Sequence, residues 1–503
     1  MPANLVIRAD AGPQIGTGHV MRCLALAETW LQGGGSATLA SVNLPSALAQ
    51  RAQMAGVGLQ SIKAAPGSHA DAKGLAALAA KANASWVVID GYHFDADYQR
   101  ELKRARLRVL CIDDFGHAKH YNADFVLNQN LGADENLYPS REPHTQLLLG
   151  TRFVQLRNEF SKWRDWSRTI PPQAKKILVT LGGSDSENVT LKVVEAIQRI
   201  PNPDFETTIV IGGGNPHGEI LKSRITHHAS HITLIQNAAN MPELMAGAAL
   251  AIAAGGTTAW ELAFMGLPAL TIVMADNQRS NAEQLQSAGV ARNLGWHRSL
   301  TPEQIADGIV KLSGDFSARS EMSRRACGLV DGLGNFRVWL QLNEDEIQFR
   351  RATTEDARLI WEWANEPSVR AASFSPEQIE FENHVAWFNA KLSDANCFLW
   401  VANGADGNPI GMARFDLENG AATISVSLDK TRRGKNLGAL LIWAGCRKLF
   451  RETAATVVNA FVKPDNRASI RAFQKSGFEA AGETVVKGQQ ALRFQVKRDV
   501  AKT

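Results

Sequence analysis

The segment of residues 4–31, NLVIRADAGPQIGTGHVMRCLALAETWL, decides the fold of the first part of the chain. It begins with a short apolar strand and continues into an amphipathic helix pattern at residues 19–32. Gly16 and Gly18 lie in the turn between them, where glycine lets a ligand approach the backbone and where the free amides of a helix start favour an anion. His19 stands where this turn becomes the helix, so it is a candidate functional residue.

The same rhythm of strand, turn and helix repeats up to about residue 345. Strands are expected at residues 4–9, 85–90, 108–113, 175–183, 205–212, 231–236, 250–256 and 268–274, and helices at residues 19–32, 187–200 and 258–266. This alternation predicts parallel sheets covered by helices. A polar, Pro-rich stretch between residues 155 and 175 divides the region. We therefore expect two Rossmann-like domains, residues 1–165 and 166–345, with a cleft between them.

The pattern changes near residue 346. A charged linker leads into a strand at residues 347–352, a capping signal, TTED, at residues 353–356, and a Trp-rich helix. The strands that follow look antiparallel and are expected at residues 397–404, 408–418, 421–429, 456–462 and 490–498. The sequence therefore predicts a third domain, of the α+β class, at residues 346–503.

Composition excludes several classes of protein. The net charge of +4 is small for 503 residues and no basic run concentrates it, so neither nucleic acid nor a membrane is an expected partner. The apolar segment 245–275 is broken by Gly255, Gly256, Glu261 and Pro268, which argues against a membrane span. Five dispersed cysteines and the absence of an apolar leader favour the cytoplasm. The oligomeric state stays open.

Two further Gly-rich turns follow predicted strands. The turn GGSDSEN at residues 182–188 contains the S-x-x-E pattern of a capping box, Ser184 with Glu187, and the turn GGTTAWE at residues 255–261 contains the T-x-x-E pattern, Thr258 with Glu261. Glu261 either caps its helix or accepts hydrogen bonds from the hydroxyls of a ribose. Because such turns at the carboxyl ends of parallel strands face one crevice, they predict a nucleotide-diphosphate site. The candidate binding residues are Gly16, Gly18, Gly183, Ser184, Gly256, Thr257, Thr258, Glu261, Asn277 and Gln278.

These turns resemble those of sugar-nucleotide enzymes. Residues 253–270 and 182–188 resemble the UDP-sugar-binding half of glycosyltransferase-B enzymes. The opening segment, with VVIDGY (87–92), CIDDFGH (111–117), NQN (128–130) and LLLGTRFVQLRNEF (147–160), is similar to the UDP-sugar hydrolases of pseudaminic acid biosynthesis. This resemblance covers nearly all of residues 1–345. It implies hydrolysis of UDP-2,4-diacetamido-2,4,6-trideoxy-β-L-altropyranose to UDP and the free sugar, with His19 catalytic and with Glu261 and Asn277 in contact with UDP.

The position of His19 suits a general base. The partial positive charge of a helix N-terminus disfavours an imidazolium, and a neutral imidazole takes a proton from water near pH 7. Asp10, Asp90 and Tyr92 end early strands and either orient His19 or the sugar, or act only in turns and caps. Arg8 either meets a phosphate or pairs with Asp10.

One short segment resembles a metal-binding motif in its spacing alone. The segment DADY at residues 95–98 has the spacing of a D-x-D metal site, but its position favours the start of a surface helix. No essential metal is expected.

The third domain resembles the GNAT acetyltransferases at two motifs. Residues 433–438, RGKNLG, resemble the R-x-x-G-x-G/A loop that holds the pyrophosphate of coenzyme A at a helix start, and residues 462–479 resemble the second acetyl-CoA motif. The resemblance implies acetyl-CoA as a cosubstrate. Asn436 stands where the family has glycine, but asparagine tolerates left-handed backbone, so the loop is expected to keep its shape. The implied acetyl-CoA-binding residues are Arg433, Gly434, Lys435, Asn436, Gly438, Asn466 and Ser469.

The acid and base of acetyl transfer are less clearly marked. Many GNAT enzymes use a tyrosine, seven residues after the asparagine of the second motif, to protonate the departing thiolate. Phe473 stands there, and the last of the four tyrosines is Tyr138, so water or another group must act. The segment 384–388 resembles the acetyltransferase of the same sugar pathway, or is simply a helix with Trp387 and Phe388 in the core. The candidate bases for the amine are Glu382, His384, Asp416 and Glu418.

The expected fold is therefore α/β, with two Rossmann-like domains of the glycosyltransferase-B type followed by an α+β GNAT domain. The favoured function is bifunctional: the C-terminal domain acetylates the 4-amino group of a UDP-linked sugar, and the N-terminal domains hydrolyse UDP from the product. One alternative is a glycosyltransferase that moves the sugar to an acceptor. The other is a hydrolase whose C-terminal domain binds acyl-CoA without catalysis.

Overall fold

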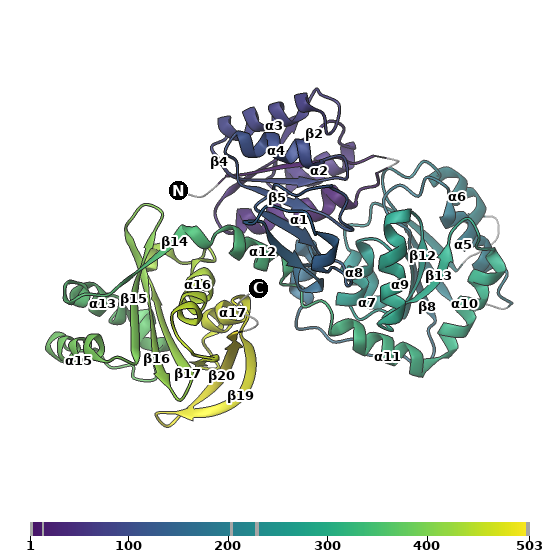
Figure 1. Cartoon of the computed structure of the whole chain (residues 1–503). Coiled ribbons are helices and arrows are strands. Elements are labelled where there is room, and N and C mark those ends of the chain that lie inside the picture. The colour runs from purple at the N-terminus through teal and green to yellow at the C-terminus, as the bar shows by residue number, and fades with distance from the viewer. Residues whose placement is uncertain (1–3, 13–14, 202–204, 227–230, 499–503) are drawn as a thin grey trace. The chain divides into compact units, whose positions relative to one another are not determined.

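The computed structural model describes residues 4–12, 15–201, 205–226 and 231–498 (Figure 1). The chain divides into two compact units. The larger contains nearly all of the chain up to residue 335, and the smaller contains residues 32–34 and the chain from residue 336 onward. The larger unit holds two parallel sheets and the smaller holds one mixed sheet. This confirms the predicted fold class.

The first sheet has seven parallel strands in the order β3-β2-β1-β4-β5-β6-β7. Its strands are β1 (Asn4–Ala9), β2 (Ser36–Ser41), β3 (Gly58–Ser61), β4 (Ala84–Asp90), β5 (Val109–Ile112), β6 (Phe125–Asn128) and β7 (Gln146–Leu149). Its helices are α1 (Gly18–Gln32), α2 (Ser46–Met54), α3 (His69–Lys81) and α4 (Ala96–Arg104). The chain order reverses between β1 and β4, so a crevice is expected at the carboxyl ends of these two strands.

The strands that sequence analysis found in this sheet are the central ones. Strands β1, β4 and β5 are almost fully buried and read as continuous apolar runs. The strands that it missed are β2, β3, β6 and β7. Strands β3, β6 and β7 have only four residues each, and β3 lies at the exposed edge of the sheet, so their hydrophobic pattern is too short to stand out.

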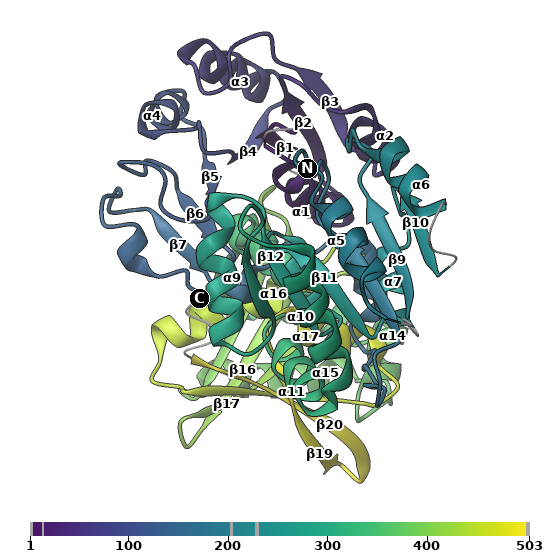
Figure 2. The ribbon, with the colours of Figure 1, turned by 90° about the vertical axis from the view of Figure 1, so that its right-hand side faces the viewer.

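The second sheet has six parallel strands in the order β10-β9-β8-β11-β12-β13, and β9 and β10 lie side by side at one edge (Figure 2). Its strands are β8 (Lys176–Thr180), β9 (Glu206–Ile211), β10 (Ile232–Gln236), β11 (Leu250–Ala254), β12 (Ala269–Val273) and β13 (Arg292–Trp296). Its helices are α5 (Val189–Gln198), α6 (Gly218–Thr226), α7 (Met241–Gly247), α8 (Thr258–Phe264), α9 (Arg279–Ser287), α10 (Pro302–Gly314) and α11 (Phe316–Cys327). Here the order reverses between β8 and β11.

The apolar segment 245–275 forms β11, α8 and β12, as the sequence predicts. Both strands are fully buried in the second sheet, which accounts for their lack of polar residues. None of the described helices combines the length and the apolar character needed to cross a bilayer. All five cysteines are free thiols, and four of them are buried.

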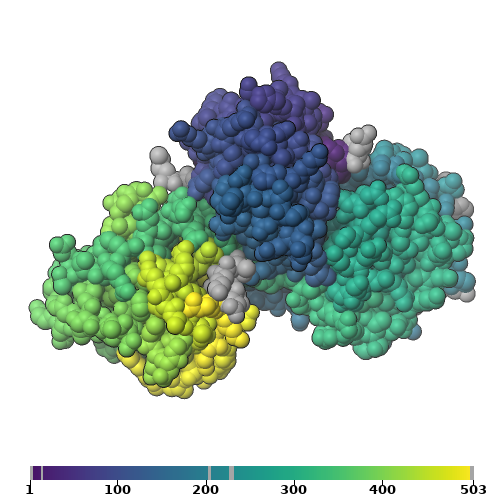
Figure 3. Space-filling model, viewed as in Figure 1, coloured from purple at the N-terminus to yellow at the C-terminus, as the bar shows by residue number. Residues whose placement is uncertain are grey.

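The third sheet has seven strands in the order β14-β15-β16-β17-β18-β20-β19. Its strands are β14 (Ile347–Arg351), β15 (Cys397–Gly404), β16 (Pro409–Glu418), β17 (Ala421–Leu428), β18 (Val457–Val462), β19 (Glu479–Val486) and β20 (Gln489–Lys497). The last strand in this order, β19, is largely exposed, and its side chains form part of the yellow surface in Figure 3. The expectation of antiparallel strands is wrong at one place, because β17 and β18 are parallel. Helix α16 connects these two strands, and a helical crossover is what a parallel pair requires.

Helices cover both faces of the third sheet. Helices α16 (Leu437–Glu452) and α17 (Arg467–Lys475) pack on one face, and α13 (Ala357–Ala364) and α15 (Phe381–Ser393) pack on the other. A short helix, α14 (Pro367–Ala372), follows α13, and α12 (Gly334–Leu342) precedes the sheet. The TTED signal is confirmed as a capping box, in which the side chains of Thr353 and Asp356 each accept the other's backbone N–H.

The loop after β5 is held by one buried carboxylate. Asp113 accepts the backbone N–H groups of Phe115 (3.0 Å), Gly116 (3.2 Å) and His117 (3.3 Å), as well as the hydroxyl of Tyr121. Burial alone would raise the pKa of Asp113, but the bonds from His117, Tyr121 and the backbone outweigh it and lower that pKa to about 2. The carboxylate therefore fixes the backbone that carries Asp114, its neighbour in the candidate site.

We predict that Asp113→Asn lowers the free energy of unfolding at pH 7 by about 2 kcal/mol, since the pKa is about 2 when folded and 3.8 in the unfolded chain. A carboxylate whose pKa is lowered by folding stabilises the folded protein at pH values above its unfolded pKa. This stabilisation is lost as the pH falls through its folded pKa. The difference between wild type and variant should therefore narrow between about pH 4 and pH 2. Urea unfolding at a series of pH values measures this stability difference. A difference that does not change with pH would show that the ionised Asp113 carboxylate does not stabilise the loop.

Candidate functional site

His19 and Asp90 meet where the order of the first sheet reverses. Ala9 and Asp90 pair at the carboxyl ends of the adjacent strands β1 and β4, so the turn after β1 leads α1 past the end of β4. His19, the second residue of α1, places Nδ1 2.6 Å from Oδ1 of Asp90. Both residues are buried. With the Nδ1–H donated to the carboxylate, Nε2 carries the lone pair of the neutral ring.

Arg22 fixes this pair from the next turn of α1. Its Nε donates to Oδ2 of Asp90 over 2.7 Å, and its terminal nitrogens donate to Asp114 over 2.8 and 3.0 Å. Burial alone would raise the pKa of Asp90, but Arg22 and His19 outweigh it and hold that pKa well below its usual value. Asp90 therefore stays ionised throughout the neutral range. Arg22 and Asp114 were not predicted, although Arg22 stands three residues after His19, the spacing of one helix face.

Tyr92 extends the network to the second sheet. Its hydroxyl donates to Oδ2 of Asp114 over 2.7 Å and accepts from Nδ2 of Asn277 over 2.9 Å. Its ring meets the ring of His19 edge-on, with 5.1 Å between the centroids. Burial, with the charge of Asp114 added to it, raises the pKa of Tyr92 far above its usual value, so the phenol stays protonated. The structure thus brings together four of the predicted residues, His19, Asp90, Tyr92 and Asn277.

Asp10 lies in a different cluster. Its Oδ2 is 2.7 Å from a terminal nitrogen of Arg8, and its Oδ1 accepts from Val42 N and Ser41 Oγ. Arg8 also donates two 3.0 Å bonds to Asp71. The alternative left open for Arg8 is therefore decided in favour of ion pairs, and Asp10 serves to compensate that buried cation.

The Gly-rich turns of the two parallel sheets lie against one another. A Cβ on Gly18 would lie 3.5 Å from Oγ1 of Thr257, and a Cβ on Gly183 would collide with the side chain of Thr17. Gly16 has a φ of +80°, which a glycine adopts without strain. Gly256 approaches Gln278, whose side chain accepts the N–H of Met274 over 3.0 Å. Residues 13 and 14 of the first turn lie outside the described residues.

The first predicted capping box, Ser184 with Glu187, is wrong. Helix α5 begins later, at Val189, and Asp185 takes the N–H groups of Val189 and Thr190, both over 2.8 Å. Glu187 bonds Arg298 instead. The helix starts too late for Ser184, and the carboxylate of Asp185 has two oxygens, one for each of the two free amides.

The second predicted capping box, Thr258 with Glu261, is also wrong. Thr257 is the N-cap residue of α8 and makes no side-chain cap bond. Glu261 bonds Arg157 with both of its oxygens, over 2.6 and 2.8 Å. Arg157 comes from the segment that follows the first sheet, so this ion pair joins that segment to helix α8, which packs on the second sheet. Arg157 was not predicted, because nothing near it in the sequence indicates its partner.

The N-terminus of α16 forms the predicted Gly-containing loop. Gly434 has a φ of +81°, and Asn436, the N-cap residue, has a φ of +60°. Left-handed asparagine therefore replaces the usual glycine, as the sequence predicts. The helix start has no side-chain cap, which leaves its amides to a ligand. Arg433 bonds Glu366, Ser368 and the carbonyl of Leu428. Lys435 and Gly438 lie in the same loop and first turn.

The second predicted acetyl-CoA motif forms the start of α17. Asn466 is the N-cap residue, and its side chain accepts the N–H of Ser469 over 3.1 Å. Phe473 is buried and meets the ring of Phe478 edge-on, with 5.0 Å between the centroids. A tyrosine at this position would have to bury its hydroxyl or displace this packing.

The candidate bases of the third domain differ in environment. His384 is buried beside the rings of Trp387 and Phe388, and burial lowers its pKa, which fits the core interpretation. Asp416 accepts bonds from Lys391 (2.7 Å) and Arg414 (2.9 Å). Burial alone would raise its pKa, but these two cations outweigh it and lower that pKa. The remaining candidates, Glu382 and Glu418, are exposed.

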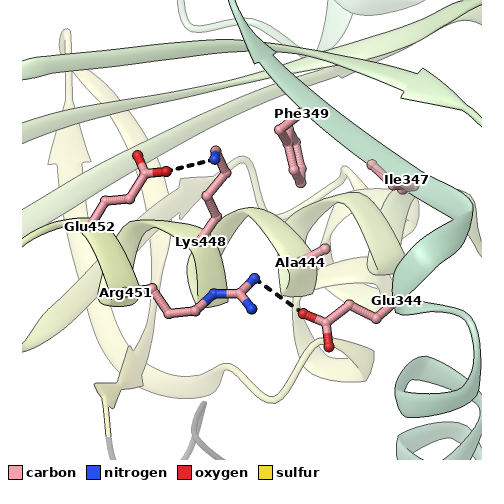
Figure 4. Close-up of a pocket in the computed structure, with 7 residues that line it drawn as sticks. All are labelled: Glu344, Ile347, Phe349, Ala444, Lys448, Arg451 and Glu452. Carbon is pink, nitrogen blue, oxygen red and sulfur yellow. Dashed lines mark hydrogen bonds and ion pairs between the residues drawn. The ribbon is translucent and has the colours of Figure 1, made fainter. Parts of the chain in front are cut away.

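A cavity of about 330 Å³ lies between α16 and β14 (Figure 4). Figure 4 shows that its charged side chains pair with one another: Lys448 with Glu452, and Arg451 with Glu344. None of the predicted site residues lines it. Among the described residues no three His, Cys, Asp or Glu side chains are grouped to hold a metal ion, and Asp95 of the DADY segment caps α4, as expected for a surface helix.

Two family models match the chain. The glycosyltransferase family 28 C-terminal domain matches residues 177–332, and the acetyltransferase (GNAT) domain matches residues 346–479. The chain therefore contains a nucleotide-sugar domain similar to glycosyltransferase family 28 and an acetyltransferase domain of the GNAT type.

Three similar proteins illustrate the extent of the relationship. An uncharacterized protein of Methanocaldococcus jannaschii is 23% identical over 413 residues, which cover 78% of this chain and 81% of that protein. A Helicobacter pylori protein, the pseudaminic acid cytidylyltransferase and UDP-2,4-diacetamido-2,4,6-trideoxy-beta-L-altropyranose hydrolase, is 27% identical over 207 residues, which cover 41% of this chain and 37% of that protein. A solved aminoglycoside acetyltransferase with bound coenzyme A is 20% identical, with a TM-score of 0.29, and the match covers 31% of this chain and 97% of that one.

We predict that Asn436→Gly leaves stability within a few tenths of a kcal/mol of wild type, whereas Asn436→Ala lowers the free energy of unfolding by about 1 kcal/mol, because a Cβ without a local polar bond disfavours left-handed backbone. Urea unfolding measures the difference. Equal stability of the two variants would show that the loop does not need the left-handed conformation.

Proposed function

We propose that the chain is a bifunctional enzyme acting on a UDP-linked amino sugar. The acetyltransferase domain transfers the acetyl group of acetyl-CoA to the 4-amino group of the sugar. The two parallel-sheet domains then hydrolyse the product, UDP-2,4-diacetamido-2,4,6-trideoxy-β-L-altropyranose, to UDP and the free sugar. The observation that carries the hydrolytic half is the 2.6 Å contact between His19 Nδ1 and Asp90 at a Gly-rich helix start.

His19 acts as the general base in this proposal. Its Nε2 takes a proton from water while the water oxygen attacks the anomeric carbon. The bond between that carbon and the phosphate oxygen breaks, and UDP leaves with the electron pair. Asp90 is a positioning residue, since it fixes the tautomer that leaves the lone pair on Nε2 and stabilises the imidazolium that forms. General base assistance of this kind contributes about 10²–10⁴-fold in rate.

The leaving group is held by backbone amides and by two side chains. The starts of α1 and α8 supply amides whose dipoles favour a diphosphate. Asn277, held at the end of the His19 network by Tyr92, contacts the nucleotide. Glu261 accepts the ribose hydroxyls, and its ion pair with Arg157 fixes its carboxylate for that role. Gly183, Ser184, Gly256, Thr257, Thr258 and Gln278 complete the site.

In the acetyltransferase domain the sugar amine attacks the thioester carbonyl, the carbon–sulfur bond breaks, and coenzyme A leaves as the thiolate. The loop 433–438 holds the pyrophosphate of the cosubstrate. Phe473 supplies no proton and no tyrosine follows Tyr138, so water protonates the thiolate. Water also takes the proton of the amine, because His384 is buried in the core and Asp416 is already neutralised by two cations.

Glycosyl transfer is the second candidate function, because the matching model of residues 177–332 describes glycosyltransferases. The two reactions differ in what accepts the sugar. A hydrolase releases UDP from the nucleotide sugar with water alone, whereas a transferase needs an added acceptor. A hydrolase with a non-catalytic acyl-CoA-binding domain would release UDP but no coenzyme A thiol.

We predict that His19→Ala reduces UDP release by about 10²–10⁴-fold and leaves acetyl transfer unchanged, because the base is lost and the fold is kept. The assay follows UDP in the absence of any sugar acceptor and, separately, coenzyme A thiol release with the UDP-linked amine. His69→Ala is the matched control, since His69 lies on the same domain with 63% of its side chain exposed. Normal UDP release by His19→Ala would refute the proposed base.

We predict that Asp90→Asn also lowers UDP release by about 10²–10⁴-fold, because an amide that donates to Nδ1 places the ring proton on Nε2. The dependence of kcat/KM on pH should lose its acidic limb, a change that a purely structural role would not cause. Asp71→Asn is the control, since Asp71 is another buried carboxylate that binds an arginine of the same domain. Equal losses in both variants, with unchanged pH profiles, would count against the positioning role.

A further inference from the structure

The two faces of the third sheet differ in character around β17 and β18. Side chains of one face, among them Ala422, Ile424, Val458 and Ala460, are buried under α16 and α17 in one apolar cluster. Because side chains alternate along a strand, the intervening residues point to the other face. That face is half-exposed and polar at Thr423, Ser425, Asn459 and Gln495. A substrate that reaches the opening of the sheet must therefore come from this polar face.

Strands β17 and β18 pair over three residues only. Their register runs from Ala421 opposite Val457 to Thr423 opposite Asn459. Beyond that row, β17 continues to Leu428 and β18 to Val462 with no pairing between them. The sheet thus opens toward the loop 433–438, which follows β17 and starts α16. Under the proposed function this opening receives the acetyl-bearing arm of the cosubstrate.

An arginine flanks the opening on each side. Arg414 of β16 pairs with Ser425, two residues beyond Thr423, and donates to the hydroxyl of Ser425 over 3.2 Å. Arg493 of β20 pairs with Phe461, two residues beyond Asn459. Both arginines lie on the polar face. They stand in the first row of side chains across the strands beyond Thr423 and Asn459, the last residues that pair β17 with β18.

The two arginines differ in their partners. Arg414 is already bonded to Asp416 over 2.9 Å and lies over the ring of Trp387, 5.1 Å from its centroid. Arg493 donates to Oδ1 of Asn459 over 3.3 Å and has no carboxylate partner among the described residues. An unpaired, half-buried cation on a polar face is available to an anionic ligand.

The adjacent row of the same face carries the opposite charge. Glu479, opposite Gln495, lies one row from Arg493, and rows of one face are about 6.6 Å apart, whereas Asp416, opposite Thr423, is already bonded to Lys391 and Arg414. A ligand with an anion at one end and an ammonium at the other matches this order. In a UDP-linked 4-amino sugar the diphosphate leaves the ring at C1 and the amine stands across the ring at C4.

We propose that this polar face is the acceptor site of the acetyltransferase domain and that it selects an acceptor with a diphosphate, which Arg493 binds. The proposal rests on the proposed acetyl transfer and specifies its substrate class. The diphosphate meets Arg493, and the amine is directed toward Thr423 and the opening. An amino sugar without the nucleotide would lack the group that Arg493 holds.

The test compares two acceptors in the full-length protein carrying His19→Ala, so that the nucleotide sugar is not consumed. One acceptor is the UDP-linked 4-amino sugar and the other is the same amino sugar without UDP. For Arg493→Gln we expect KM for the UDP-linked acceptor to rise about tenfold or more, with KM for acetyl-CoA and for the free amino sugar unchanged. Arg493→Lys should recover part of the loss. Arg451→Gln is the matched control, because Arg451 lies on α16, on the opposite side of the sheet.

A second measurement reads binding without relying on transfer. Hydrogen exchange of the full-length protein with coenzyme A should show that the UDP-linked amine protects residues 421–428, 457–462 and 489–497, and that Arg493→Gln removes this protection. An unchanged KM in Arg493→Gln, an equal rise for both acceptors, or no protection in the wild type would each overturn the proposal. Protection without thiol release would support the acceptor site and refute acetyl transfer itself.

Discussion

The buried guanidinium of Arg22 is the group on which the candidate hydrolytic site depends. It bonds Asp90 at the end of β4 and Asp114 beyond β5, so one cation ties α1 to the ends of two neighbouring strands. Without it, the buried carboxylate of Asp90 and the partly buried one of Asp114 would lose their shared cation, at a cost of about 3–5 kcal/mol. His19 shares Asp90 with Arg22 and lies one helical turn earlier. The position of its ring is therefore set by the same contact that ties α1 to these strand ends.

The acetyltransferase domain builds its site in a different way. The candidate hydrolytic site consists of a closed network of side chains, whereas the loop before α16 relies on backbone shape, with Gly434 and Asn436 both in the left-handed region. A parallel pair of strands that separates after three residues creates the opening beside that loop. On the polar face, Arg414 and Arg493 stand on either side of this opening. In the proposed function, specificity for the acceptor would thus depend on side chains, and binding of the cosubstrate on backbone.

Local sequence patterns were reliable only where local contacts decide the outcome. The Thr353–Asp356 capping box formed because both partners lie within one turn and no competitor intervenes. The same pattern failed at Ser184–Glu187, where Asp185 takes the helix amides, and at Thr258–Glu261. Glu261 instead bonds Arg157, 104 residues away. A long-range ion pair of this kind leaves no periodicity in the sequence, so no pattern could have indicated it.

The sequence by itself determined the alternation of strand and helix, the buried central strands, the change of pattern near residue 346, the left-handed asparagine of the acetyltransferase domain and the candidacy of His19. These follow from hydrophobic period, glycine placement and the conformational range of individual residues, which are local properties. Only the tertiary structure decided which side chains meet. It brought Asp90 to His19 across 71 residues, inserted Arg22 between two carboxylates, and sent Asp10 to Arg8. The physical reason is that the ends of parallel strands become neighbours only when the sheet assembles, and buried charges then pair with whatever partner that assembly places beside them.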